Sequence, residues 1–303
     1  AGSEAIFANR RDNRTIICES GREVQMNAVE KFIIKDKVVI ITGGAGLLGR
    51  KHAEAVIEGE GIAVLIDVCE SAIQNAKTEL LNKYGKAGKV EGYVADITSR
   101  SEVEKVIEEI KNKYGHIDVL INNAANNPKV EGKAQNMKAI QFENFPLEMW
   151  ENDIAVGLTG ALICSQVCGQ EMVKQKKGVI LNISSDLGVI APDQRIYRRD
   201  GLKEDEQTIK PVTYSVIKHG VIGLSKYLAT YYAEKGIRVN ALCPAGVYNG
   251  QNEEFLEKLT NLIPMGRMAN VEEYKSTILY LISEASSYMT GSVIVVDGGR
   301  TCW

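Results

Sequence analysis

From Lys37 onward, short runs of β-branched and other apolar residues alternate with longer amphipathic stretches. A short, continuous apolar run predicts a strand buried on both faces, and the intervening stretches have helical periodicity. Strands and helices in regular alternation predict a parallel sheet wound on both faces, because such crossovers are right-handed. The predicted strands are 38–42, 62–67, 90–95, 118–121, 178–183, 237–242 and 292–296, and one long helix is predicted around 147–174.

No linker rich in proline, glycine or serine divides this pattern. We therefore predict a single-domain, Rossmann-type doubly wound α/β fold of about seven strands over residues 31–303. Residues 1–30 are polar and lack a clear period, so they are interpreted as a flexible arm or a leader, with Met26 a candidate native start. The stretches 126–145 and 186–211 are too long for simple connections, and long loops are usually functional or disordered.

The charge and cysteine content exclude several classes of protein. The formal net charge is −3 at pH 7, whereas nucleic acid or an anionic membrane surface usually requires a basic patch. The sequence contains no run of about 18 apolar residues, which is the length that a helix needs to span a bilayer. The six cysteines form no CxxC pair and have no matching histidine spacing. This pattern is typical of reduced thiols in a cytoplasmic protein and indicates neither a disulfide framework nor a metal site.

The segment 42–49, with the sequence TGGAGLLG, joins the first predicted strand to the first helix. Glycines let the backbone turn tightly and approach a pyrophosphate, which rests on amides at the helix N-terminus. Asp67 ends the second strand, where a carboxylate can bind the ribose hydroxyls of an adenosine. The same carboxylate would repel a 2′-phosphate, and no arginine adjoins it. The pattern predicts binding of NAD(H) in preference to NADP(H).

Further short motifs follow the later strands. They are Asp96-Ile97, Asn122-Asn123-Ala124-Ala125, Ser184-Ser185, Tyr214-Ser215-Val216-Ile217-Lys218, Arg238-Val239-Asn240 with Pro244-Ala245-Gly246-Val247, and Asp297-Gly298-Gly299. Together with the glycine turn, these motifs resemble the short-chain dehydrogenase/reductase superfamily over residues 35–303. The stretches 157–160 and 190–195 also resemble a narrower branch, the dehydrogenases of flagellin modification and surface-glycan biosynthesis.

The resemblance implies which residues contact the dinucleotide. Asp96 and Ile97 would flank the adenine, and Lys218 would hold the nicotinamide ribose. The implied cofactor contacts are Gly43, Gly46, Leu47, Leu48, Asp67, Asp96, Ile97, Asn123, Ala124, Tyr214, Lys218 and Val247. Members of this family are usually homotetramers, so the resemblance also implies a homotetramer or homodimer.

Tyr214 and Lys218 are four residues apart on a predicted helix, so their side chains share a face. The unperturbed pKa of tyrosine, about 10, is too high for a base near neutrality. A nearby cation stabilises the phenolate and lowers that pKa. The pair therefore predicts oxidation of an alcohol, with Tyr214 taking the hydroxyl proton as hydride leaves. Ser185 would donate a hydrogen bond to the reacting oxygen, and Ser184 is the alternative for this role.

Three features depart from the family pattern. The glycine turn has the TGxxGxxG spacing of the longer, sugar-nucleotide branch. Gly157 stands where the family has an asparagine that supports a kink and a proton relay, although glycine also permits a kink. Ser185 and Tyr214 are 29 residues apart, more than the family usually has. The extra chain carries Arg195, Tyr197, Arg198, Arg199, Lys203 and Lys210.

We expect this insertion to bind a phosphate or carboxylate of the substrate, because arginine holds such groups through two parallel hydrogen bonds. The alternative is a solvated loop, since acidic residues balance its charge.

The sequence as a whole predicts an NAD-dependent oxidoreductase that interconverts alcohol and ketone on a sugar or sugar-derived substrate in surface-glycan biosynthesis. Two alternatives remain. A sugar-nucleotide epimerase or dehydratase is suggested by the glycine turn, but the motif 297–299 leaves little chain for the substrate domain of such an enzyme. An inactive NAD-binding sensor or scaffold is suggested by Gly157, but the retained Ser185, Tyr214 and Lys218 oppose it.

Overall fold

The computed structural model describes residues 15–17, 23–85, 88–126 and 140–303. Most of the predicted arm or leader, residues 1–14 and 18–22, lies outside the described residues. Within it, β1 (Thr15–Ile17) pairs antiparallel with β2 (Glu23–Gln25), and the short helix η1 (Glu30–Phe32) leads into the main sheet. Residues 127–139, within the first long connection, also lie outside the described residues.

The main sheet has seven parallel strands in the order β5-β4-β3-β6-β7-β8-β9, which confirms the predicted Rossmann-type fold. The chain moves outward from β3 to one edge and then returns to the other side of β3. This reversal places a crevice at the carboxyl ends of β3 and β6, where ligands bind in such sheets. The strands are β3 (Val38–Thr42), β4 (Ile62–Asp67), β5 (Val90–Val94), β6 (Val119–Asn122), β7 (Gly178–Ile183), β8 (Ile237–Pro244) and β9 (Val293–Val296).

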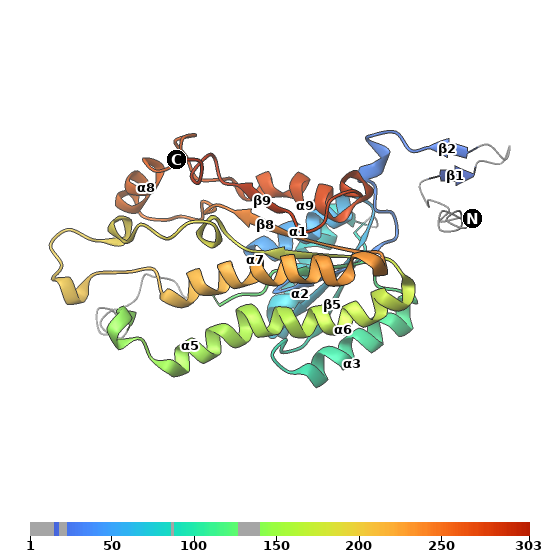
Figure 1. Cartoon of the computed structure of the whole chain (residues 1–303), viewed down its shortest axis with the longest axis horizontal. Helices are drawn as coiled ribbons and strands as arrows, with labels where there is room; N and C mark the ends of the chain where they lie inside the picture. The colour runs from blue at the N-terminus through green and yellow to red at the C-terminus, as the bar shows by residue number, and fades with distance from the viewer. Residues whose placement is uncertain (1–14, 18–22, 86–87, 127–139) are drawn as a thin grey trace, which may run out of the picture.

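Helices cover both faces of this sheet (Figure 1). Alternate side chains of a strand point to opposite faces, so Val39 and Ile41 pack into one hydrophobic core and Val38 and Ile40 into the other. The first core includes α1 (Leu47–Glu58), α2 (Glu70–Tyr84) and α9 (Lys275–Ile282). The second includes α3 (Arg100–Tyr114), α6 (Gly160–Gln175) and α7 (Val212–Tyr232).

A buried polar network joins the centre of the sheet to the second layer of helices. The Asn122 side-chain amide donates to Asn182 Oδ1 at 2.8 Å and to Ser165 Oγ at 3.0 Å. The Asn182 amide donates to Ser225 Oγ at 2.8 Å. Because buried polar groups are costly unless they are hydrogen-bonded, this network sets the position of α7 relative to β7. The helix α7 carries Tyr214 and Lys218, and Ser185 follows the end of β7.

The structure corrects one predicted helix. The sequence suggested a continuous helix over 147–174, but α5 (Leu147–Ile154) and α6 are separated by a π-helical turn, Ala155–Thr159. The insertion contains three short helices, η6 (Asp186–Gly188), η7 (Gln194–Tyr197) and η8 (Glu204–Glu206). The helix α8 (Glu253–Thr260) is followed by the 3-10 helix η10 (Val271–Tyr274), which leads directly into α9. In the described part of the chain, no helix combines the length and hydropathy needed to cross a bilayer.

Candidate active site

A cavity of about 880 Å³ opens at the carboxyl ends of the strands. Its size is in the range of ligand pockets. Its wall contains all the predicted cofactor-binding and catalytic residues, which come from positions 43 to 247 of the sequence. The sequence motifs therefore converge on one place. The fold brings them together because the strand ends of a parallel sheet share one edge.

The glycine turn at the base of this cavity requires glycine at more than one position. Gly43 has a φ of +60°, and a Cβ there would lie 2.9 Å from the Cα of Ala124. Gly46 is the N-cap of α1 and provides no side chain to cap the helix. The first backbone N–H groups of α1, including those of Leu47 and Leu48, are therefore left to a ligand or water. A pyrophosphate fits this position, because helix N-termini favour anions.

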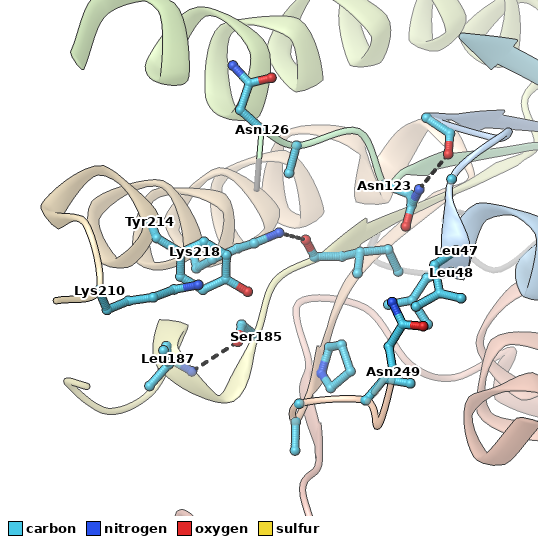
Figure 2. A pocket seen from close by; sticks show the side chains of 18 of the residues that line it. Leu47, Leu48, Asn123, Asn126, Ser185, Leu187, Lys210, Tyr214, Lys218 and Asn249 are labelled. Atoms are coloured by element: carbon cyan, nitrogen blue, oxygen red, sulfur yellow. Dashed lines mark hydrogen bonds between the residues drawn. The ribbon is translucent and has the colours of Figure 1, made fainter. Parts of the chain in front are cut away.

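Two side chains hold the glycine turn in place. Asp67 accepts hydrogen bonds from the backbone N–H of Ala45 at 3.2 Å and of Cys69 at 3.3 Å. The Asn123 amide donates to the carbonyls of Thr42 at 3.0 Å and Gly43 at 3.1 Å (Figure 2). Asn123 thus orders the turn in addition to lining the cavity. Asp67 lies where a ribose would follow the pyrophosphate, which fits a dinucleotide.

The predicted catalytic pair lies at the beginning of α7 (Figure 2). The Lys218 ammonium donates to the carbonyl of Ile183 at 2.9 Å and lies 5.7 Å from the centre of the Tyr214 ring. Burial, together with the nearby Lys210 ammonium, lowers the pKa of Lys218 to about 8. Burial also raises the pKa of Tyr214, while the Ser185 hydroxyl acts in the opposite direction. The phenolate therefore depends on positive charge in the site.

The structure separates the roles of the two adjacent serines. The Ser184 hydroxyl donates to the backbone carbonyl of Lys218 at 2.7 Å and so supports α7. The Ser185 hydroxyl donates to Asp186 Oδ1 at 2.6 Å and accepts from the Leu187 N–H at 3.2 Å. The Ser185 hydroxyl also lowers the pKa of the neighbouring Tyr214 phenol, whereas the Ser184 hydroxyl is occupied by the backbone of α7.

Sequence reasoning missed the ion pair behind Ser185. The Arg300 guanidinium donates to Asp186 Oδ2 at 2.8 Å, and both side chains are buried. Asp186 therefore holds Ser185 through one oxygen and Arg300 through the other. Asp186 could have been noticed because it directly follows Ser185. Arg300 gave no local signal, because it is 114 residues away in the sequence.

The insertion and α8 form the outer wall of the cavity. Ile196 packs against Leu259, and the rings of Tyr197 and Phe255 are 5.5 Å apart. Arg195 does not face the cavity: it pairs with Asp193 at 2.7 Å and its side chain is 85% exposed. The cations of the insertion that do line the cavity are Arg198, Arg199 and Lys210. Of these, Arg198 also forms an ion pair with Glu204.

Gly157 lies in the π-helical turn and faces the catalytic helix. A Cβ at this position would lie 2.7 Å from Cγ2 of Ile217, which is between Tyr214 and Lys218 in the sequence. Glycine therefore allows α7 to approach closely. A π-turn interrupts the regular helical hydrogen bonds and often marks a functional site. A π-helical interruption is thus present at this position without the asparagine.

A doubly wound sheet, a glycine turn and a buried tyrosine–lysine pair at the strand ends define a dinucleotide-binding oxidoreductase. Comparison with known proteins gives its family. The short chain dehydrogenase family model matches residues 37–197, and the enoyl-(acyl carrier protein) reductase model matches 205–301. The chain belongs to the short-chain dehydrogenase/reductase family, and it is an oxidoreductase that acts on CH–OH groups.

Several relatives align over almost their whole length. A 3-oxoacyl-(acyl-carrier-protein) reductase of Thermotoga maritima is 34% identical, covering 88% of this chain and 98% of the relative. An NAD-dependent glycerol dehydrogenase of Listeria innocua is 32% identical, covering 89% and 96%. The post-translational flagellin modification protein A of Campylobacter coli is 30% identical, covering 88% and 99%. A short chain dehydrogenase of Leptospira borgpetersenii, solved with bound NAD+, has a TM-score of 0.74 and 29% identity, covering 92% and 97%.

Gly157→Ala should disturb the catalytic helix. The added methyl group would push Ile217 outward, lowering the free energy of unfolding by about 1–3 kcal/mol and kcat/KM by about 10- to 100-fold. Denaturation and steady-state kinetics measure the two effects. In a double-mutant cycle with Ile217→Ala, the two substitutions should be less harmful together than the sum of the single effects. Strict additivity would show that no such contact exists.

Arg300→Met should leave the Asp186 carboxylate buried without its ion-pair partner. Breaking one side of a buried pair costs about 3–5 kcal/mol of the free energy of unfolding. Denaturation at fixed protein concentration measures this loss. Adding Asp186→Asn removes the unpaired charge, so the double variant should regain part of the stability. A double variant no more stable than Arg300→Met would contradict this account of the pair.

Proposed function

We propose that this protein is an NAD(H)-linked dehydrogenase that interconverts an alcohol and a ketone on a sugar or sugar-derived substrate. The observation that carries this proposal is the placement of Ser185, Tyr214 and Lys218 on the wall of a cavity that also contains the glycine turn. The polyol named for the glycerol dehydrogenase relative supports a sugar-like substrate. The flagellin modification relative supports a role in surface-glycan biosynthesis, which we place in the cytoplasm.

The residues of the chain move one proton in this reaction. Tyr214, as the phenolate, takes the proton of the substrate hydroxyl as hydride leaves the carbon. Bound NAD+ supplies the nicotinamide that accepts this hydride. Lys218 stabilises the phenolate, and the Ser185 hydroxyl, once it turns from Asp186 to the substrate, stabilises charge on the reacting oxygen. Asp186 and Arg300 hold Ser185 in position. Reduction of the ketone is the reverse, with Tyr214 as the acid.

We propose that the substrate carries a phosphate or carboxylate facing the insertion. Arg198 and Arg199 line the outer wall, and a guanidinium can bind either group through two hydrogen bonds. The exposed Arg195 has no part in this revised proposal.

We also propose a homotetramer or homodimer. Of the apolar residues on α6 and α7, Met172, Val221 and Leu228 are buried within the protein and cannot form an interface. The exposed surface of α6 and α7 instead presents Leu162 and the stacked rings of Tyr227 and Tyr231. These side chains would be covered by a second copy of the chain.

The substrate class and the base can be tested in one assay. Absorbance of the nicotinamide is followed with NAD(H) or NADP(H) and a panel of free, phosphorylated, carboxylated and nucleotide-linked sugars and polyols. We expect turnover with a phosphorylated or carboxylated sugar. Tyr214→Phe should lower kcat by about 10²- to 10⁴-fold, the usual contribution of a general base. Turnover that survives Tyr214→Phe would overturn the mechanism. Turnover confined to uncharged substrates would overturn the proposal that the substrate carries a phosphate or carboxylate.

Asp67 provides a test of cofactor preference. Asp67→Ser keeps an oxygen near the turn but removes the charge that binds ribose and repels a 2′-phosphate. Because hydrogen bonds to charged groups are worth about 1.5–3 kcal/mol, the preference for NAD+ over NADP+ in kcat/KM should fall by about 10- to 100-fold. Glu70→Gln, a nearby exposed position outside the cavity wall, is the control. An unchanged ratio in Asp67→Ser would show that Asp67 does not select the cofactor.

A further inference from the structure

Lys210 lies against the face of the Tyr214 ring. Its ammonium nitrogen is 3.7 Å from the ring centre, closer than the 5.7 Å of Lys218. In Figure 2 the Lys210 side chain extends from the segment before α7 to the Tyr214 ring, whereas the Lys218 side chain, from the next turn of that helix, ends on its hydrogen bond to the Ile183 carbonyl. Tyr214 therefore has one lysine four residues before it and another four residues after it. Only the second belongs to the motif identified in the sequence.

The insertion builds this position. The Lys210 backbone N–H donates to Gln194 Oε1 at 2.9 Å, and the Gln194 amide donates back to the Lys210 carbonyl at 3.2 Å. Pro211 follows with a φ of −57° and serves as the N-cap of α7. Proline is pre-organised for the start of a helix and restricts the residue before it to extended conformations. The backbone of Lys210 is thus fixed from both sides, unlike that of a lysine on a mobile surface loop.

Several charged and titratable groups approach the ring. Lys218 approaches from α7, Lys210 from the insertion, and the Asp186–Arg300 ion pair from η6 and the C-terminal turn. The Asp186 carboxylate raises the pKa of Tyr214 and so opposes the two lysines. Among the described residues, Tyr197, whose pKa is raised mainly by burial, and Cys243, which faces Lys218 from β8, also lie nearby. Lys210 is therefore placed to offset the Asp186 carboxylate at the phenol.

Removing two ammonium groups from water has a cost. Burial lowers the pKa of Lys210 to about 8, although the Asp186 carboxylate opposes this shift. A cation over an aromatic face is attracted more strongly when desolvated. It is attracted still more when the ring carries the negative charge of a phenolate, because opposite charges within about 4–6 Å favour each other's charged forms. The phenolate in turn favours the charged form of the Lys210 ammonium, so each group supports the ionised form of the other.

We propose that Lys210 is a second positioning cation for the catalytic tyrosine, stabilising the Tyr214 phenolate from the ring face while Lys218 acts from the helix. This inference rests on the proposed role of Tyr214 as the base. It also gives the insertion a function in the chemical step: its length allows Gln194 to fold back on Lys210. The anionic substrate proposed above involves the arginines of the insertion and is a separate matter.

The test follows the ionisation of Tyr214 in the full-length protein with NAD+ and no substrate. Ultraviolet difference absorbance reports phenolate formation, with Tyr214→Phe subtracted to remove the other tyrosines. Lys210→Met keeps the length of the side chain but removes the charge. Loss of a cation destabilises the phenolate, so the midpoint should move to higher pH by about 1–3 units. Lys210→Arg should stay close to the parent protein. Lys226→Met, an exposed position on the same helix, should not move it.

A second measurement uses the alcohol that the panel identifies. The acidic limb of the kcat/KM profile for its oxidation should move upward in Lys210→Met by the same amount, because oxidation needs the phenolate. Activity should recover as the pH rises past the new midpoint. Gln194→Ala, which releases only the backbone of Lys210, should shift both midpoints less and in the same direction. If Lys210→Met does not fold, Gln194→Ala takes its place as the test of the proposal.

The outcomes are distinguishable. Unchanged midpoints in folded Lys210→Met, with or without an increase in substrate KM, would overturn the proposal, because a substrate-binding or purely structural lysine does not set the ionisation of the tyrosine. A shifted phenolate midpoint in a protein that turns over no member of the panel would support the role of Lys210 and count against the proposed substrate class.

Discussion

The arrangement of the site depends on the burial of a charged lysine. An ammonium group removed from water must be hydrogen-bonded and matched by negative charge, or it loses its proton. Lys218 meets the first condition through the carbonyl at the end of β7, and Ser184 anchors its backbone from the same strand end. The Asn122–Asn182–Ser225 network holds the helix and strand in register below it. The Tyr214 phenolate supplies the matching negative charge. The attraction between the two charges therefore keeps Lys218 charged and keeps the tyrosine ready to act as a base.

The departures from the family pattern are related to one another in space. Gly157 lets the π-turn approach Ile217 between the two catalytic residues. The insertion returns to the same helix and places Lys210 on the other side of the tyrosine. The C-terminal segment also reaches the site, where the Arg300 guanidinium forms an ion pair with the Asp186 carboxylate. Changes that look independent along the chain therefore act on the surroundings of one phenol.

Most of the fold and about half of the site could be predicted from the sequence. The buried runs predicted all seven strands, because a strand covered on both faces must be apolar throughout. The glycine turn, Asp67 and the Tyr214–Lys218 pair were found because each is a local pattern with a local reason. The long helix was predicted without its π-turn, since apolar periodicity does not reveal one extra residue in a turn. Arg195 was assigned to the substrate, but the adjacent Asp193 holds its side chain outside the cavity.

The sequence by itself determined the class of fold, the position of the cofactor turn and the identity of the candidate base, because these depend on spacing within one strand, turn or helix. Only the tertiary structure decided that Ser184 anchors the backbone of α7, that Asp186 is paired with Arg300, and that Lys210 lies on the tyrosine ring. The first two contacts join residues that are far apart in the sequence, and all three form only when the chain folds. The sequence pattern therefore gives no sign of which polar groups are removed from water side by side.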